Sequence, residues 1–229
     1  MNIVVFSGSG MSAESGIDTF RTNGGLWEHH KIEDVATPDA WKRNPELVQS
    51  FYNMRRKHIL EVEPNKAHQL IAALEKRHQV TVITQNIDDL HERAGSKNVV
   101  HLHGNIRFSK SSGPNQEEAY YPIEGWELTM NDLCPEGFPL RPHVVWFGEN
   151  VPMINVAIDF IQKADVLMVV GTSLTVYPAA GLIHYAGKNC KKYIIDPNVG
   201  KMYLPKDFIS FATYASDGIQ ACIEEIERR

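Results

Sequence analysis

The stretch MNIVVFSGSGMSAESGIDTFR, residues 1–21, decides the fold. Its apolar run at residues 3–6 leads directly into a glycine-rich segment that contains Gly8 and Gly10. A short buried strand followed by glycines is typical of dinucleotide-binding folds, because glycine lets the backbone approach a pyrophosphate. Alone, the pattern is a weak signal. It leaves open whether the chain uses a nicotinamide cofactor for hydride transfer or for another chemistry.

The composition is that of an ordinary globular protein. Of the 229 residues, 43% are hydrophobic and 22% are charged, and the formal net charge is −5. A weakly acidic chain gives no electrostatic basis for binding nucleic acid, so we expect no such partner. No apolar run approaches the roughly 20 residues that span a bilayer, so we expect no membrane partner. The three scattered cysteines do not form a disulfide framework, and together with the absence of a secretory pattern they predict a cytoplasmic protein.

Short apolar runs alternate with helical patterns along the chain. Residues 66–77 place apolar side chains at i, i+3, i+4 and i+7, and residues 217–228 repeat that spacing, with Ser216 or Asp217 as the expected cap. The strand-like runs are mostly apolar without alternation, as in a parallel sheet that is covered on both faces. The sequence therefore predicts an α/β fold with a doubly wound, Rossmann-like parallel sheet. The expected strands lie at 3–6, 80–84, 99–102, 144–147, 166–170 and 193–195.

Two stretches interrupt this alternation and predict a smaller inserted domain. Its expected helical part is 31–78, and its expected ribbon-like part is the polar segment 105–140. The Rossmann-like domain then comprises 1–30, 79–104 and 141–229.

The residues after the glycines argue against hydride transfer. A dehydrogenase fingerprint continues into an uninterrupted helix and then a strand that ends in Asp or Glu about 20 residues on. Here Gly16 interrupts the helix, and Asp18 with residues 23–25 makes a loop of the next stretch. Polar motifs instead follow three other expected strands, where open α/β sheets bind ligands. They read TQNID at 84–88, HLHG at 101–104 and GTSL at 171–174.

These motifs, with residues 7–21, RPHVVWFGE at 141–149 and GTSLTVYPAAG at 171–181, resemble the sirtuin family of NAD-dependent protein deacylases. The similarity is greatest to the bacterial and mitochondrial branch that removes acidic acyl groups. The resemblance implies that NAD is consumed as a co-substrate with nicotinamide as the leaving group. It implies an enzyme that moves the acyl group of a protein lysine to ADP-ribose and releases free lysine. Acylated lysines are then the expected partner, and a monomer is the expected state.

Most of the expected site residues follow from this resemblance as NAD contacts. Phe20 and Arg21 match a mobile loop that shields the ribose, and Asn86 matches the residue that orients the nicotinamide ribose. Ile17 and Asp88 match contacts to the nicotinamide carboxamide. The other expected cofactor-binding residues are Gly8, Ser9, Gly10, Ser12, Gln85, Gly171, Thr172, Ser173, Asp196, Asn198, Asp217 and Gly218.

His103 matches the catalytic base of the family, with Asn86 and Arg21 as the other catalytic residues. Removing a ribose hydroxyl proton near neutral pH suits an imidazole, whose ordinary pKa is about 6.5. His101 competes for this role, since it lies two residues earlier on the same face of a strand. We favour His103 because it directly precedes Gly104, as in the family; without the resemblance, a lone histidine is more often structural.

Tyr52 and Arg55 lie at i and i+3 of an expected helix and so face the same side. Tyrosine offers one hydroxyl donor and arginine a forked pair of donors for a carboxylate. The spacing alone also fits a core tyrosine beside a solvated arginine. In the desuccinylase branch such a pair grips the distal carboxylate of succinyl- or malonyl-lysine, and Ala36 matches a small residue of that pocket. The segment that pairs with the substrate peptide as an added strand matches Val145, Phe147, Gly148 and Glu149.

The zinc site of most sirtuins is degenerate in this chain. In place of two Cys-x-x-Cys pairs, residues 109–112 read SKSS and residues 134–137 read CPEG. Serine hydroxyls are poor zinc ligands at neutral pH, so we predict no metal. An aromatic mini-core is the expected substitute, formed by Tyr120, Tyr121, Pro122, Trp126, Leu128 and Phe138.

Other functions stay open on the sequence. A plain NAD-dependent deacetylase and an ADP-ribosyltransferase both need the NAD cradle, but neither needs Tyr52 and Arg55. A non-catalytic NAD or ADP-ribose sensor has no need of His103. If only the fold class is considered, a hydride-transfer dehydrogenase is the simplest interpretation.

Overall fold

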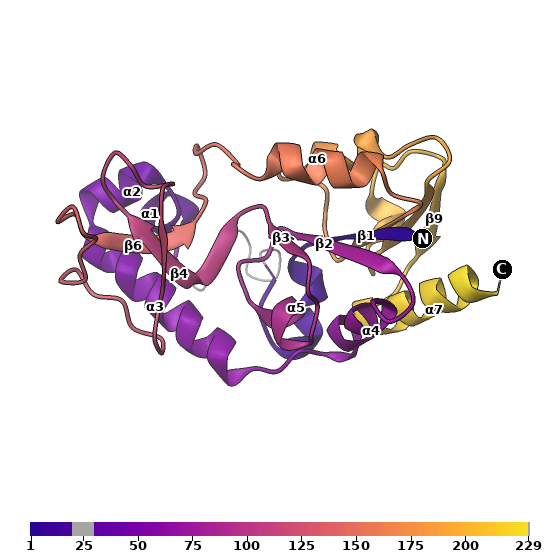
Figure 1. Ribbon diagram of the computed structural model, residues 1–229, viewed down its shortest axis with the longest axis horizontal. Helices are drawn as coiled ribbons and strands as arrows, with labels where there is room; N and C mark the ends of the chain where they lie inside the picture. The colour runs from indigo at the N-terminus through magenta and orange to yellow at the C-terminus, as the bar shows by residue number, and fades with distance from the viewer. Residues whose placement is uncertain (20–29, 229) are drawn as a thin grey trace.

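A six-stranded parallel sheet forms the larger part of the molecule (Figure 1). It is seen in a computed structural model that describes residues 1–19 and 30–228. Counted along the chain, the strands have the order 3-2-1-4-5-6, which is the order of dinucleotide-binding folds and confirms the predicted fold class. From one edge to the other they are β3 (Val99–His101), β2 (Gln79–Thr84), β1 (Asn2–Ser7), β7 (Val166–Val170), β8 (Lys191–Ile195) and β9 (Phe208–Phe211).

Helices cover both faces of this sheet, which explains the unbroken apolar runs of its strands. On one face, Ile3 and Val5 of β1 pack in a core with helices α4 (Lys66–Leu74) and α7 (Ala215–Glu227). On the other face, Val4 and Phe6 pack with α6 (Ile154–Gln162) and the 3-10 helix η3 (Ala179–Tyr185). None of the helices in the described part of the chain is long and apolar enough to cross a membrane.

A three-stranded antiparallel sheet and a group of helices form a smaller part, at the end of the molecule away from the termini (Figure 1). The sheet has the order β5-β4-β6, with β4 at Gly104–Ser111, β5 at Tyr120–Pro122 and β6 at Leu140–Val144. The expected strand 144–147 is therefore wrong: the strand ends at Val144 and pairs with β4, not with the large sheet. The helices are α1 (Ile32–Val35), α2 (Pro38–Arg43) and α3 (Pro45–Glu61).

Helix α3 joins the small sheet through a buried arginine. Arg56 is fully buried, and its guanidinium donates to the carbonyl oxygens of Ile106, at 2.6 Å, and Trp126, at 2.7 Å. Burial lowers the pKa of Arg56 to about 10, so the side chain is still charged at neutral pH. Charge-assisted bonds to carbonyls compensate for the loss of water. They fix the rotation of α3, and hence the direction in which Tyr52 and Arg55 point.

Helix α7 begins differently from the sequence expectation. Neither Ser216 nor Asp217 caps it; the N-cap residue is Tyr214, whose side chain makes no capping bond. The carboxylate of Glu14, 202 positions away in the chain, accepts the backbone N–H of Ser216 at 2.9 Å. An acidic side chain at the first turn of a helix satisfies a free N–H and interacts favourably with the helix dipole. This bond ties the glycine-rich segment to the start of the last helix.

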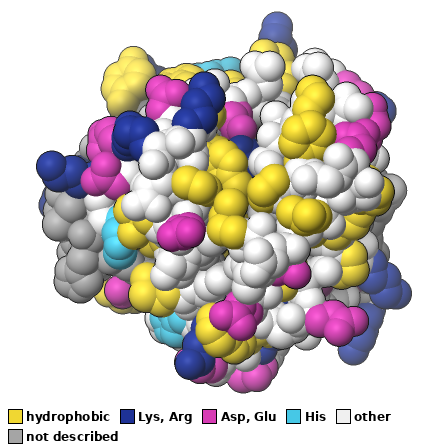
Figure 2. Space-filling view, turned by 90° about the vertical axis from the view of Figure 1, so that its left-hand side faces the viewer, with side chains coloured by type: hydrophobic (Ala, Val, Ile, Leu, Met, Phe, Trp, Pro, Cys, Tyr) yellow, Lys and Arg dark blue, Asp and Glu magenta, His cyan; other side chains and the backbone are white. Residues whose placement is uncertain are grey.

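The segment that matches the zinc ribbon of the family has an aliphatic core. Ile123, Leu128, Cys134 and Leu140 form its buried cluster, against which Tyr121 packs. The expected aromatic mini-core is wrong in this respect, because Tyr120, Trp126 and Phe138 are 44%, 40% and 39% exposed. Apolar side chains are accordingly visible among charged ones on this end of the molecule (Figure 2).

The remaining thiol of that segment has a serine as its neighbour. Cys134 Sγ lies 3.4 Å from Ser111 Oγ, within hydrogen-bond distance. Among residues 1–19 and 30–228, no three His, Cys, Asp or Glu side chains gather in a way that could hold a metal ion.

We expect the purified protein to hold less than about 0.1 zinc per chain by metal analysis, because a thiol and a serine make a poor zinc site. Removal of a structural zinc would lower the Tm, because such a metal contributes directly to folding. Since we expect no zinc, exhaustive treatment with a chelator should leave the Tm unchanged. One tightly held zinc per chain, or a Tm that falls on chelation, would contradict this prediction.

Candidate active site

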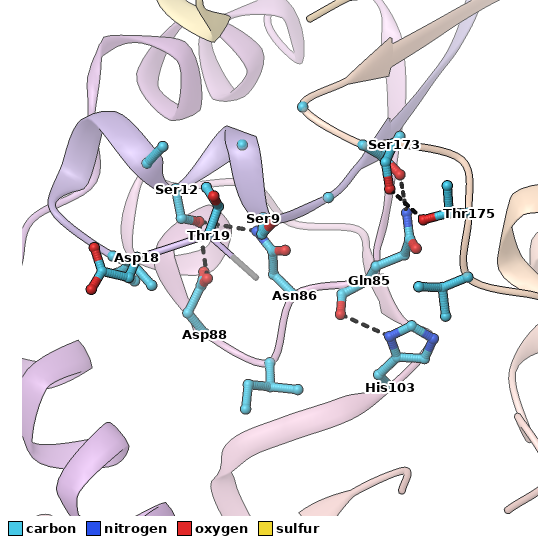
Figure 3. A pocket seen from close by; sticks show the side chains of 18 of the residues that line it. Ser9, Ser12, Asp18, Thr19, Gln85, Asn86, Asp88, His103, Ser173 and Thr175 are labelled. Atoms are coloured by element: carbon cyan, nitrogen blue, oxygen red, sulfur yellow. Dashed lines mark hydrogen bonds between the residues drawn. The ribbon is translucent and has the colours of Figure 1, made fainter. Parts of the chain in front are cut away.

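A cavity of about 670 Å³ lies at the carboxyl ends of the central strands, where the strand order reverses between β1 and β7 (Figure 3). Ligands of open α/β sheets bind at this place. The cavity extends from Asp196 after β8 to Tyr52 and Arg55 on α3, so both parts of the molecule contribute walls. It gathers most of the residues expected from the sequence: Gly8, Ser9, Gly10, Ser12, Ile17, Ala36, Tyr52, Arg55, Gln85, Asn86, Asp88, His103, Val145, Phe147, Gly148, Glu149, Gly171, Thr172, Ser173, Asp196 and Asn198.

The wall at the strand ends depends on three glycines that lie against each other. The Gly8 N–H donates to Val170 O at 3.0 Å, and the Gly10 N–H donates to Gly171 O at 2.8 Å. A Cβ on Gly10 would lie 2.7 Å from Gly171 Cα, so there is no space for a side chain. Gly171 also has a φ of +60°, in the left-handed region that favours glycine. The two loops can therefore meet, backbone against backbone, only with glycine at these positions.

A chain of hydrogen bonds orients the amide of Asn86 (Figure 3). Asn86 Nδ2 donates to Ser12 Oγ at 3.0 Å, and the Ser12 hydroxyl donates in turn to Asp88 Oδ2 at 2.9 Å. Asp88 is buried, which raises the pKa of its carboxyl above the ordinary value. With its Nδ2 held by Ser12, the side chain of Asn86 is fixed at the wall of the cavity.

A second buried network supports the same loop from behind, and the sequence reasoning missed it. Thr84 Oγ1 accepts the backbone N–H of Asn86 at 3.0 Å and the hydroxyl of Ser7 at 2.9 Å. His91 Nε2 lies 3.1 Å from Ser7 Oγ. Because the Ser7 proton is given to Thr84, the serine oxygen accepts from His91. Burial lowers the pKa of His91 well below its usual range, so the ring is a neutral donor. The signal for this network in the sequence was His91, the last residue of the motif TQNIDDLH at 84–91.

His103 is held in the tautomer that a general base needs. Its Nδ1 lies 3.0 Å from the carbonyl oxygen of Gln85, which can only accept, so Nδ1 carries the hydrogen and Nε2 keeps a lone pair (Figure 3). Burial lowers the pKa of His103, so the ring is neutral at neutral pH. Gln85 is itself fixed, because its amide donates to Thr172 Oγ1 at 2.9 Å.

His101, the competing candidate for the base, is paired with a carboxylate outside the cavity. Its Nε2 lies 2.6 Å from Glu92 Oε1, and it is not among the described residues that line the cavity. Burial lowers the pKa of His101, but the hydrogen bond and the charge of Glu92 outweigh burial and raise it overall. A protonated imidazole that is paired with a carboxylate is a poor base, so the geometry favours His103.

Some of the expected residues lie outside the cavity or outside the described residues. Asp217 and Gly218 do not line it; a Cβ on Gly218 would lie 2.2 Å from Ile195 Cγ2, so this glycine serves helix packing. Tyr214 and Ala215, just before them, line the cavity instead. Phe20 and Arg21 lie outside the described residues.

The cavity end on α3 is apolar except for a phenol and a guanidinium. Tyr52 is fully buried and Arg55 is 6% exposed, so the alternative of a solvated arginine is wrong. Ala36, 2% exposed, and Ile59 complete this end.

The segment after β6 forms part of the cavity wall. The Val145 N–H donates to His103 O at 2.9 Å, and the Phe147 N–H donates to Ala36 O at 3.0 Å. The segment is thus fastened to His103 on one side and to Ala36, beside Tyr52 and Arg55, on the other. The carboxylate of Glu149 accepts the Trp146 N–H at 2.8 Å and pairs with Arg141 at 2.9 Å.

The strand order and the place of the cavity define a protein of the dinucleotide-binding, Rossmann-like class. Residues 8–178 match the profile described as the Sir2 family, and the chain belongs to this family.

The chain is similar over nearly its whole length to curated bacterial relatives. It is 49% identical over 223 residues to an NAD-dependent protein deacylase of Bacteroides thetaiotaomicron, covering 96% of this chain and 95% of that one. It is 50% identical over 202 residues to an NAD-dependent protein deacylase of Aggregatibacter actinomycetemcomitans, covering 88% and 96%.

Solved structures of Sir2 proteins have the same fold. A Sir2 homologue in complex with NAD is 36% identical, with a TM-score of 0.83 over 99% of this chain and 89% of that one. A complex of Sir2 with a p53 peptide and NAD+ is 30% identical, with a TM-score of 0.78 over 99% and 94%.

The residues at the site fit a dinucleotide. The glycine contacts allow the close backbone approach that a pyrophosphate needs, and Asp196 beyond them offers a carboxylate for ribose hydroxyls.

We expect Gly10→Ala to weaken binding of ADP-ribose at least about tenfold and to lower the free energy of unfolding by about 1–3 kcal/mol, because the added methyl meets the backbone of Gly171. Calorimetric titration and denaturant unfolding measure the two effects. Gly187→Ala is the matched control, since a Cβ there has its nearest neighbour at 3.9 Å. Equal binding by both variants would show that the contact does not shape the site.

We expect the acid limb of kcat/KM against pH to have its midpoint below about pH 6.5, the ordinary value for histidine. Because burial lowers the pKa of His103, the base stays neutral to a lower pH than an exposed imidazole. Activity should be complete above the lowered pKa and lost as the pH falls through it. Nicotinamide release from an acetyl-lysine peptide gives the profile, and His103→Ala should abolish it. A midpoint above pH 6.5 would contradict the assignment.

Proposed function

We propose that this chain removes succinyl and malonyl groups, and also acetyl groups, from lysine side chains of proteins while it consumes NAD. NAD-dependent protein deacylation follows from membership of the Sir2 family and from two deacylase relatives at about 50% identity. The preference for acidic acyl groups rests on one observation: Tyr52 and Arg55 are buried together at the end of the cavity.

A buried guanidinium discriminates between acyl groups by charge. A succinyl or malonyl chain ends in a carboxylate, which gains charge-assisted hydrogen bonds from Arg55 and a further one from the Tyr52 hydroxyl. The Arg55 guanidinium carbon also lies 5.8 Å from the centre of the Phe51 ring, which limits its freedom to turn. An acetyl group ends in a methyl and gains neither bond. The small side chain of Ala36 leaves space for the longer acyl chain.

In the proposed reaction NAD supplies, when bound, the ribose that accepts the acyl group. His103 takes the ribose hydroxyl proton at Nε2, because Nδ1 is held by Gln85. Asn86, held by Ser12, orients the nicotinamide ribose, and Ile17 and Asp88 bind the carboxamide. We assign phosphate contacts to the glycine turn and to the loop after β7, and a catalytic role to Arg21.

The expected partner is an extended protein segment that carries the acylated lysine. The segment 145–149 lines the cavity, and we propose that an added strand pairs with its backbone. The solved complex of a Sir2 relative with a p53 peptide and NAD+ supports a peptide as the partner. We further propose that the protein acts as a monomer without nucleic acid or membrane. We propose that its two domains have the boundaries given by the sequence, except that α4, which packs against the large sheet, belongs to the larger domain and β6, which pairs with β4, to the smaller.

Matched kinetics with Arg55→Met test the proposed function. We expect the ratio of kcat/KM for succinyl-lysine to kcat/KM for acetyl-lysine, on one peptide sequence, to fall about 10- to 100-fold, the effect of losing a charged hydrogen-bond partner. Nicotinamide release measures both rates. Lys57→Met on the same helix is the control, because Lys57 is not among the described residues that line the cavity.

The outcomes separate the alternatives. If the wild type removes only acetyl groups, the chain is a plain deacetylase and Arg55 is a structural residue. No release of nicotinamide with any acyl peptide would leave an NAD or ADP-ribose sensor.

A further inference from the structure

Tyr52 lines the cavity, and its hydroxyl also takes part in a hydrogen bond with another side chain. Trp146 Nε1 lies 3.1 Å from the Tyr52 oxygen. Both side chains are buried, Tyr52 fully and Trp146 to 98%, and they come from positions 94 residues apart in the chain. The loop that carries Trp146 also carries Val145 and Phe147 of the expected peptide segment, so this bond joins the peptide side of the site to the acyl side.

The direction of this bond follows from the chemistry of its two groups. An indole N–H can only donate, so the tyrosine oxygen accepts. A phenol has one proton, and the bond to Trp146 leaves this proton unused. Burial raises the pKa of Tyr52 well above its usual range, so the phenol keeps its proton at neutral pH.

We propose that Trp146 is a positioning residue for acyl selectivity: its indole N–H occupies an acceptor position of the Tyr52 hydroxyl and so turns the single phenolic proton toward the acyl end of the cavity. There it can donate to the distal carboxylate of an acidic acyl group. In the absence of the indole donor the hydroxyl would rotate freely, and a carboxylate would have to order it. The inference rests on the proposed acidic-acyl activity.

Trp146 is itself held on several sides, as a positioning residue requires. The guanidinium carbon of Arg141 lies 3.6 Å from the centre of its ring, and Trp41 packs against it with ring centres 5.8 Å apart. Glu149 fixes the other end, since its carboxylate accepts the Trp146 backbone N–H at 2.8 Å and pairs with Arg141 at 2.9 Å. The indole therefore cannot turn away from Tyr52 without breaking several contacts.

The test compares Trp146→Phe, which keeps an aromatic ring but loses the donor, with Tyr52→Phe and with the double variant. For Trp146→Phe we expect the succinyl-to-acetyl ratio of kcat/KM to fall about 5- to 10-fold, the effect of one buried hydrogen bond. The loss should appear as a higher KM for the succinyl peptide, and as a weaker Kd for that peptide in calorimetry. In the Tyr52→Phe background the same change should have no further effect on the ratio, because there is no hydroxyl to direct.

Trp41→Phe is the matched control. It also removes an indole from the cluster around Trp146, but Trp41 makes no hydrogen bond to Tyr52 in the part of the chain that the structure describes. We expect its ratio to equal that of the wild type, because the phenylalanine ring still packs against Trp146 and the bond to Tyr52 is kept. The Tm of each variant shows whether it is folded.

A variant that removes only the donor keeps the inference testable if Trp146→Phe does not fold. Trp146→3-benzothienylalanine, introduced at this one codon, retains the bicyclic ring with sulfur in place of N–H. It should lower the ratio as Trp146→Phe does.

The outcomes distinguish this inference from the function on which it rests. A lower ratio in Tyr52→Phe together with an unchanged ratio in both Trp146 variants would overturn the role of Trp146 and leave the proposed function intact. An unchanged ratio in Tyr52→Phe and in Arg55→Met would overturn both. If Trp146→Phe lowers the ratio equally in the wild type and in the Tyr52→Phe variant, Trp146 acts through packing and not through the hydroxyl.

Discussion

The close contact between the glycine turn after β1 and Gly171 after β7 is the constraint on which the site is built. Two parallel strands bring their carboxyl ends to the same edge, but side chains would normally keep the loops that follow them apart. Here a Cβ on Gly10 or on Gly171 would lie within 3 Å of the opposite backbone, and the loops meet through the bond from Gly10 N–H to Gly171 O. This meeting point is the switch in strand order, and it forms one wall of the cavity.

Buried hydrogen bonds carry that constraint into the reactive part of the site. Ser12, two residues after Gly10, holds both Asn86 and Asp88. Ser7 and Thr84, at the ends of neighbouring strands, fix the backbone of Asn86 from the other side. Polar groups without water are costly unless they are paired, so such networks have few alternative arrangements. The polar residues of the site are therefore placed before any ligand binds, which is the condition for efficient electrostatic catalysis.

In the proposed function, the smaller part of the molecule adds acyl selectivity to this frame. Arg56 fixes helix α3 against the small sheet, and the same helix presents Tyr52 and Arg55 to the cavity. The loop after β6 then connects two walls of the cavity, through Val145 at His103 and Phe147 at Ala36. A change in this loop would alter the surroundings of both His103 and Tyr52. In the proposed function, peptide binding and acyl selection are therefore physically coupled through this loop.

Much of this architecture could be predicted from residues 1–21 and the strand-end motifs, because local rules govern those features. Apolar runs of strand length, glycine after a strand and polar residues at strand ends depend on spacing along the chain and on the geometry of parallel strands. The doubly wound fold class and the placement of the glycine turn, Asn86 and His103 at one edge of the sheet follow from them. The family resemblance, and not spacing, singled out Tyr52 and Arg55.

Other features were decided only by the tertiary structure, because they depend on how distant segments rotate and pack. Nothing near Ser216 predicts that Glu14, 202 residues away, receives its N–H, and nothing near Tyr52 points to Trp146. The pairing of β6 with β4, the burial of Arg55 and the aliphatic core around Cys134 are of the same kind. Each requires side chains from separate segments to fill one space, and the energy of such a contact is defined only when all of its partners are in place.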